Sequence, residues 1–187
     1  AKSDNMLETL ISSRTRIKLL LRLFLNPGTT AYLRGLADEF DESTNSVRVE
    51  LNRFEEANML VSENKGNKKL YKANDKHPLF RDIHNILLKY IGVDKVINVI
   101  IERMGNLEKM YMTGDYARGK DSGIIDLVFV GEIDNSYIME MVAKAENMIN
   151  KKVRFIIYDS DEWSEKRLKE DGNDTYLLLW EQKTEKV

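Results

Sequence analysis

The spacing of apolar residues changes at about residue 106, and this change constrains the fold more than any other feature of the sequence. Before it, apolar residues recur three or four positions apart, which is the period of amphipathic helices. After it, short apolar runs at 107–113, 124–130, 153–158 and 175–180 alternate with helical stretches, which is typical of a small α/β domain. Helices are expected over 135–150 and, after a cap at 159–161, to residue 169, and the mostly apolar run at 124–130 is expected to be a central strand. The sequence therefore predicts an α+β chain with two modules, residues 1–75 and 106–187, joined by a helical linker over 76–105.

The composition narrows the chemistry that the chain can carry. The 187 residues include no cysteine, which excludes disulfides, zinc–thiolate sites and cysteine nucleophiles. The net charge of −2 hides a contrast, because residues 1–75 carry 12 basic against 11 acidic side chains and residues 76–187 carry 17 against 20. Binding to nucleic acid must therefore rest on local patches of the first module.

The sequence gives no indication of a membrane segment or a leader. No stretch reaches the roughly 18 uninterrupted apolar residues of a membrane span. Residues 1–6 are polar and lack the apolar core of a signal peptide. We expect a soluble, cytoplasmic protein that does not bind membranes.

The first module is predicted to consist of three helices followed by a hairpin. Helices are expected over 14–25, from an N-cap at Thr29-Thr30 to residue 40, and over 44–57. Strands are expected to start at residues 60 and 70, with a turn at 64–67 between them. The resulting order is helix, helix, turn, helix, hairpin.

Polar and basic side chains gather on the third helix and the hairpin. Arg48 and Asn52 can donate hydrogen bonds to base edges in a major groove, and the hairpin lysines can contact phosphates. The candidate DNA-binding residues are Ser43, Thr44, Asn45, Arg48, Asn52, Arg53, Lys65, Asn67, Lys68, Lys69 and Lys72. The alternatives are a solvated hairpin with ordinary surface lysines, or a module that binds protein. Glu50, Glu55 and Glu56 are expected on the solvent side and at the far end of the third helix.

Residues 33–40 (LRGLADEF) and 43–60 (STNSVRVELNRFEEANML) form a short helix, a turn and a helix rich in polar residues. With the flanking segments, residues 12–75 resemble the winged helix-turn-helix domains of ArsR-like transcriptional regulators. Asn58 stands where that family usually has glycine, and both residues tolerate the left-handed backbone at a helix end. The resemblance implies a regulator that binds double-stranded DNA. The family's metal-sensing cysteines are missing, which excludes thiol-based sensing.

The linker is predicted to contain two helices. Its first helix is expected to start at His77-Pro78 and carries on one face the apolar residues Phe80, Ile83, Ile86, Leu87 and Tyr90. Gly92 ends this helix, and Asp94 is expected to cap a second one that is apolar almost all round. The linker either forms a homodimer interface, which would suit a two-fold operator, or packs on the second module. His77 and His84 are interpreted as surface histidines rather than as a metal site.

The second module contains Gly114, Ala117-Arg118-Gly119, Ser122 and Asp126-Leu127-Val128 between and on its first two strands. This segment resembles the signature of minimal nucleotidyltransferases of the DNA polymerase β-like superfamily, in which Gly-Ser precedes Asp-apolar-Asp on a strand. The resemblance implies a site where carboxylates hold two divalent ions against a triphosphate.

This signature is incomplete. Asp115 replaces the serine and Ile124 replaces the first aspartate. The resemblance also implies a third carboxylate on a later strand, but Arg154 lies at that position, which leaves Asp126 alone. Active transfer would need a shifted register that uses Asp121 or Asp115 with Asp126. We therefore expect no catalytic residues, no metal and no cofactor. The candidate nucleotide or anion site that remains consists of Gly114, Arg118, Gly119, Lys120 and Asp126.

The patterns and the two resemblances together imply a DNA-binding transcriptional regulator, a homodimer, with an inactive nucleotidyltransferase-like second module. That module serves either as a scaffold or as a sensor of a nucleotide effector. The rival interpretations are an active nucleotidyltransferase tethered to a winged helix, and a protein-interaction module.

Overall fold

The computed structural model describes residues 6–102 and 106–182. The predicted end of the linker, at residue 105, therefore lies outside the described residues. The chain divides into two compact units, Ala1–Tyr90 and Ile91–Val187. The prediction of a mixed α+β chain is confirmed, because helices accompany a three-stranded and a four-stranded sheet.

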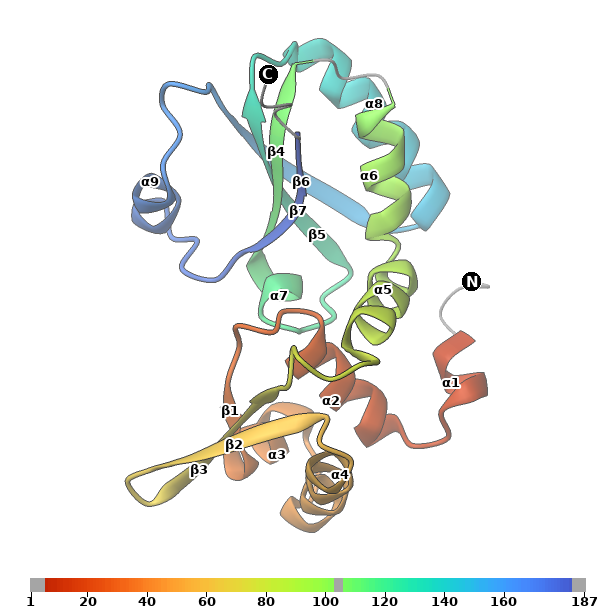
Figure 1. The fold of residues 1–187 in the computed structure, drawn as a ribbon. Helices are drawn as coiled ribbons and strands as arrows, with labels where there is room; N and C mark the ends of the chain where they lie inside the picture. The colour runs from red at the N-terminus through yellow and green to blue at the C-terminus, as the bar shows by residue number, and fades with distance from the viewer. Residues whose placement is uncertain (1–5, 103–105, 183–187) are drawn as a thin grey trace. The chain divides into compact units, whose positions relative to one another are not determined.

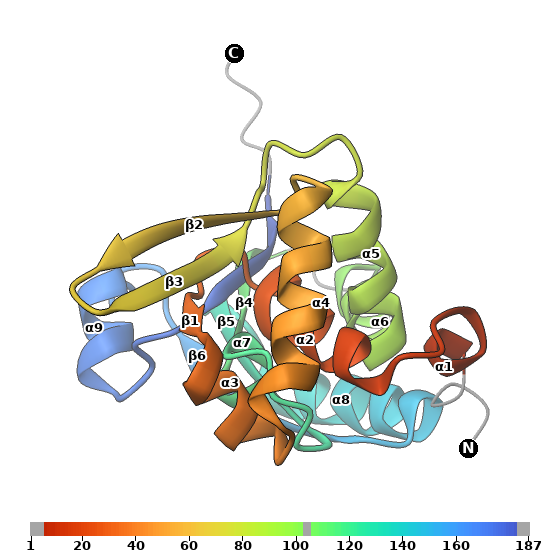
Figure 2. The same cartoon turned by 90° about the horizontal axis from the view of Figure 1, so that it is seen from below.

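The first unit consists of helices around a small antiparallel sheet (Figure 1). Its helices are α1 (Met6–Leu10), α2 (Arg14–Phe24), α3 (Leu33–Phe40), α4 (Thr44–Glu56) and α5 (Phe80–Ile91), which ends at the unit boundary. Its strands are β1 (Ala31–Tyr32), β2 (Leu60–Lys65) and β3 (Lys68–Ala73), in the order β1-β3-β2. Figure 2 shows α4, α3 and the β2–β3 hairpin in one view.

The start of α3 differs from the prediction. The helix begins at Leu33, because Ala31 and Tyr32 pair with Tyr71 and Leu70 of β3 as strand β1. The hydroxyl of Thr29 donates hydrogen bonds to the Arg22 and Asn26 carbonyls, at 2.9 Å each, and so completes the end of α2. The expected N-cap at Thr29-Thr30 is therefore wrong. α5 also begins later than expected, at Phe80.

The second unit is a four-stranded sheet with helices on both faces. Its elements are α6 (Val93–Ile101), β4 (Leu107–Thr113), α7 (Gly114–Ala117), β5 (Ile124–Gly131), α8 (Asn135–Ile149), β6 (Lys152–Tyr158), α9 (Glu165–Glu170) and β7 (Leu177–Glu181). The strand order is β6-β5-β4-β7, with β5 and β6 parallel and the other pairs antiparallel. Figure 1 shows α6 and α8 together on one side of this sheet and α9 on the other.

Two helix starts in this unit also depart from the prediction. Gly92, with a φ of 86°, is the N-cap residue of α6, and Asp94 lies in the helix's first turn. α9 begins at Glu165 rather than after Asp159, because the side chain of Ser164 accepts a hydrogen bond from the Arg167 amide and caps the helix there. Among the described residues, no helix is long and apolar enough to span a bilayer.

Candidate functional site

Helix α4 separates a buried face from an exposed polar one. Its inner residues Val47, Leu51 and Phe54 pack in the core, which leaves the opposite side to solvent. Exposed on that side, at helical spacing, is a set that we call the α4 polar row: Thr44, Asn45, Arg48 and Asn52. The eleven candidate DNA-binding residues of the helix and the hairpin are all exposed. The hydroxyl of Ser43 is engaged, since it accepts a hydrogen bond from the Ser46 amide at 3.1 Å and caps the helix.

Glu50 does not lie on the solvent side of α4, and that expectation is wrong. Its side chain is buried and accepts hydrogen bonds from the Ser13 hydroxyl at 3.0 Å and from Arg16 Nε at 2.9 Å. Burial alone would raise the pKa of Glu50, but the hydrogen bonds from Arg16 and Ser13 outweigh it, so the pKa is lowered. Glu50 thus joins α4 to the start of α2.

Two of the predicted DNA-contacting cations have carboxylate partners. Arg53 Nη1 lies 3.2 Å from Glu50 Oε1, and Lys69 Nζ lies 2.8 Å from Glu55 Oε2. The hydrogen bond from Lys69 to Glu55 raises the pKa of the lysine. Because these charges are balanced locally, they attract an incoming anion less than unpaired cations would.

The hairpin lysines do not form one patch. In the antiparallel register, Lys65 pairs with Lys68 and Val61 pairs with Lys72, whereas Lys69 pairs with Asn64. Because side chains alternate along a strand, Lys65, Lys68 and Lys72 share one face and Lys69 lies on the other. The sequence spacing alone therefore overstated the local positive charge.

A groove of about 490 Å³ lies between the start of α3 and the hairpin. The residues that line this hairpin groove are Tyr32, Leu33, Arg34, Asn67, Lys68, Lys69 and Tyr71. Lys68 Nζ lies 4.3 Å from the centre of the Tyr32 ring, a cation–π contact. Tyr32 and Arg34 are not among the residues predicted from the sequence, and the pairing of β1 with β3 brings them to the hairpin.

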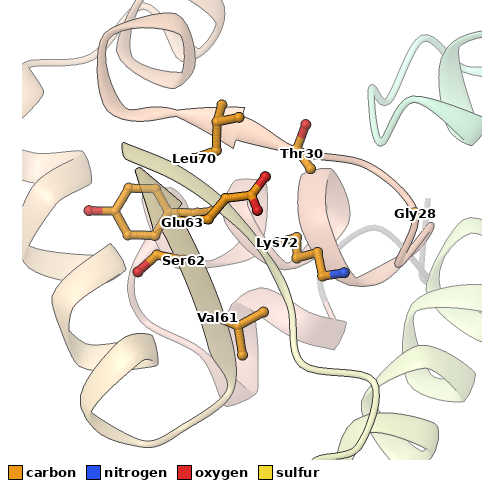
Figure 3. Close-up of a pocket in the computed structure, with 8 residues that line it drawn as sticks. Gly28, Thr30, Val61, Ser62, Glu63, Leu70 and Lys72 are labelled. Carbon is orange, nitrogen blue, oxygen red and sulfur yellow. The ribbon is translucent and has the colours of Figure 1, made fainter. Parts of the chain in front are cut away.

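A second hollow of the same unit, about 260 Å³, lies beside the hairpin (Figure 3). It is lined by Gly28, Thr30, Val61, Ser62, Glu63, Leu70, Tyr71 and Lys72. Lys72 shares this hollow with the carboxylate of Glu63, so the hollow carries no excess of positive charge.

The two histidines lie in separate local environments. His77 Nδ1 accepts a hydrogen bond from the Leu79 amide at 3.2 Å, and His84 Nδ1 lies 3.1 Å from the carbonyl of Phe24. Within residues 6–102 and 106–182, His, Asp and Glu side chains form no group of three or more with metal-ligand geometry.

In the second unit, Asp126 and Arg154 occupy paired positions on the parallel strands β5 and β6. They form a two-point ion pair, with Nε 2.6 Å from Oδ1 and Nη2 3.0 Å from Oδ2. The hydrogen bond and charge of Asp126 raise the pKa of Arg154. Both carboxylate oxygens of Asp126 thus accept hydrogen bonds from a group that cannot bind a metal ion.

The other residues of the candidate anion site lie on the loop between β4 and β5. Arg118 Nη1 is 3.8 Å from Asp115 Oδ1, so both arginines near this loop have a carboxylate partner. Lys120 is exposed. Gly114, with a φ of 66°, lies directly against Asp126, and a Cβ at that position would overlap the Asp126 carboxylate. The structure therefore brings Gly114 and Asp126 together.

A polar cluster that the sequence did not suggest holds the end of this loop. Lys151 Nζ donates a hydrogen bond to the Tyr116 hydroxyl at 2.6 Å, and that hydroxyl donates to Asp121. Lys151 Nζ is also 3.6 Å from Asp121. Asp121 is thereby engaged with a tyrosine and a lysine, which opposes its use with Asp126 in a shifted register.

No protein-family model matches the sequence, and no curated protein matches it. Several solved structures are similar over about half of the chain. One is the toxin–antitoxin complex MntA–HepT, at 17% identity and a TM-score of 0.36, covering 49% of this chain and 71% of that one. Another is a Sulfolobus solfataricus protein assigned as a nucleotidyltransferase, at 26% and 0.37, covering 52% and 83%. A third is AF1382 from Archaeoglobus fulgidus, at 19% and 0.35, covering 50% and 94%.

Proposed function

We propose that this protein is a DNA-binding transcriptional regulator that acts as a homodimer. Its first unit would contact duplex DNA as a winged helix-turn-helix, and its second unit would be an inactive nucleotidyltransferase fold that serves as a scaffold. The observation that carries this proposal is the α4 polar row, an exposed set of hydrogen-bond donors on a helix that follows a short helix and precedes a basic hairpin.

The chemistry of the α4 polar row suits a major groove. The groove is about 12 Å wide and admits one helix, and it presents acceptors on guanine and both donors and acceptors on adenine. Arg48 can bind guanine through two hydrogen bonds and Asn52 can bind adenine in the same way. Thr44 and Asn45, at the helix start, can reach phosphates or base edges. Arg48 and Asn52 would therefore read sequence.

The proposal that the second unit is inactive rests on the pairing of its charged groups. A two-metal transferase needs carboxylates that are free to bind divalent ions. Here Asp126 is bound by Arg154, and Asp115 lies beside Arg118. A triphosphate entering this loop would meet carboxylates next to the two arginines. This local balance favours a scaffold over a nucleotide sensor.

The test of DNA binding is selection of bound sequences from a random duplex pool with the full chain. We expect enrichment of a palindrome, because a homodimer presents two copies of the polar row. Arg48→Ala should weaken binding to the selected site by about 1–3 kcal/mol and relax the base preference at one position of each half-site. A wild-type chain that shows no salt-dependent binding to any duplex would refute the proposal.

A further inference from the structure

Among the described residues, two of the three cations that line the hairpin groove have no carboxylate partner. Arg34 and Lys68 line it, and among the described residues neither has an ion-pair partner. The third cation of the lining, Lys69, is balanced by Glu55. The groove thus brings two unpaired cations together where the start of α3 meets the hairpin.

The groove is also built from segments far apart in the sequence. Tyr32 pairs with Leu70 in the β1–β3 ladder, which fixes the first turn of α3 beside the hairpin tip. Lys68 Nζ lies 4.3 Å from the centre of the Tyr32 ring, and this cation–π attraction favours a position of the ammonium group beside α3. Asn67 adds an amide donor at the tip. Cations that are positioned in advance lose less conformational entropy when they bind an anion.

We propose that the hairpin groove is a phosphate-binding site for the backbone of the same DNA duplex that the α4 polar row reads, with Arg34 and Lys68 as its charged contacts. This inference rests on the proposed function. It assigns to α3 a contact with DNA that lies outside the third helix and the hairpin. The polar lining residues, arginine, lysine, asparagine and tyrosine, are all types that donate hydrogen bonds to phosphate oxygens.

The number of released counterions measures such contacts. For duplex DNA, the logarithm of the binding constant falls with the logarithm of salt concentration by about 0.9 for each neutralised phosphate. Removing one contact should therefore lower the slope by about one and weaken binding similarly on every sequence. Arg34 and Lys68 together should account for about two units of slope.

The experiment measures the salt dependence of binding of the full chain to a fluorescent duplex of random sequence. Arg34→Gln and Lys68→Gln should each lower the slope by about one, and the double variant by about two. Arg34→Lys should keep the wild-type slope because it keeps the charge. Lys89→Gln, which removes an exposed cation of α5, is the matched control and should leave the slope unchanged.

The outcomes separate this inference from the proposed function. If Arg48→Ala weakens binding while Arg34→Gln and Lys68→Gln retain the wild-type slope, the groove is not a phosphate site and the proposed function stands. If the wild-type chain shows no salt-dependent binding, both proposals fail. Both substituted side chains are exposed, and far-UV circular dichroism of each variant verifies that the helices are intact.

Discussion

Arg154 shows how a single side chain changes the chemistry open to its neighbours. Its guanidinium occupies both oxygens of Asp126, at 2.6 Å and 3.0 Å, on the strand next to that residue. An acidic residue at position 154 would instead place two carboxylates side by side, which is an arrangement that attracts divalent cations. With arginine at position 154, the negative charge of Asp126 is instead balanced by a side chain of the protein itself.

Incubation of the full chain with labelled nucleoside triphosphate and Mg²⁺ tests this view of Asp126. We expect no transfer of label to nucleic acid or protein above the level of the Asp126→Asn variant, because Asp126 is held by Arg154. Transfer by the wild-type chain that disappears in Asp126→Asn would show an active transferase and contradict the proposal.

For a single residue, the clearest prediction about stability concerns Glu50. Glu50→Ala should lower the free energy of unfolding of the first unit by about 2 kcal/mol, because it removes hydrogen bonds to Ser13 and Arg16 from a buried position. Both tryptophans, Trp163 and Trp180, lie in the second unit, so the change in far-UV circular dichroism that tryptophan fluorescence does not share reports unfolding of the first unit. Glu56→Ala, an exposed neighbour, is the control and should change stability by less than about 0.5 kcal/mol.

The pH dependence of Glu50 has a definite sign. Its pKa in the folded chain is below the ordinary value of 4.5, so the stabilisation is present above 4.5 and is lost as the pH falls through the folded pKa. Glu50→Gln should therefore flatten the acid limb of the stability–pH curve. An acid limb identical to that of the wild type would show that Glu50 does not contribute to it.

At the scale of elements, the contact between Gly114 and Asp126 determines the turn from β4 into α7. Gly114 has a φ of 66°, which disfavours other residues, and its Cα faces the Asp126 carboxylate too closely for a side chain. The turn and the strand-end carboxylate therefore depend on each other. This dependence accounts for the glycine without any bound phosphate.

Gly114→Ala should destabilise the second unit by more than about 2 kcal/mol, since it adds a steric overlap to the backbone strain. In an Asp126→Ala background the same substitution should cost only about 1–2 kcal/mol, because the backbone strain alone remains. Tryptophan fluorescence during urea unfolding reports this unit. An equal cost in both backgrounds would show that the carboxylate contact is not the cause.

At the scale of the whole molecule, the proposed homodimer needs an apolar surface that one copy leaves exposed. Leu79 and Ile86 are 55% and 43% exposed, and their seven-residue spacing corresponds to about two helical turns. Leu79 directly precedes α5 and Ile86 lies within it, and α5 is the helix that was predicted from the sequence as a dimerisation element. Leu79→Lys with Ile86→Lys should shift the sedimentation coefficient toward that of a monomer, while Arg81→Glu, at an exposed position on another face of α5, should not. A wild-type chain that sediments as a monomer at all concentrations would contradict the dimer.

The sequence was informative wherever a local rule decides the structure. Apolar periodicity predicted α2, α4 and α8 and placed β5 as a central strand, because the pattern of buried side chains follows directly from the geometry of each element. The resemblance to minimal nucleotidyltransferases led us to expect Arg154 near Asp126, and the register of β5 with β6 places the two residues opposite each other. Helix starts were less predictable, as the late starts of α3 and α9 show.

Only the tertiary structure decided which charged side chains form ion pairs and which remain to bind an anion. Glu50 was expected on the solvent side of α4, yet it is buried and accepts hydrogen bonds from Ser13 and Arg16, which lie more than thirty positions earlier in the sequence. The four lysines of the hairpin lie close together in the sequence, but the register of β2 with β3 places three of them on one face of the hairpin and Lys69 on the other. Tyr32 and Arg34 joined the hairpin through a two-residue strand. The sequence determines the charge that each residue carries, but ion pairing depends on distances across the fold, which no local pattern encodes.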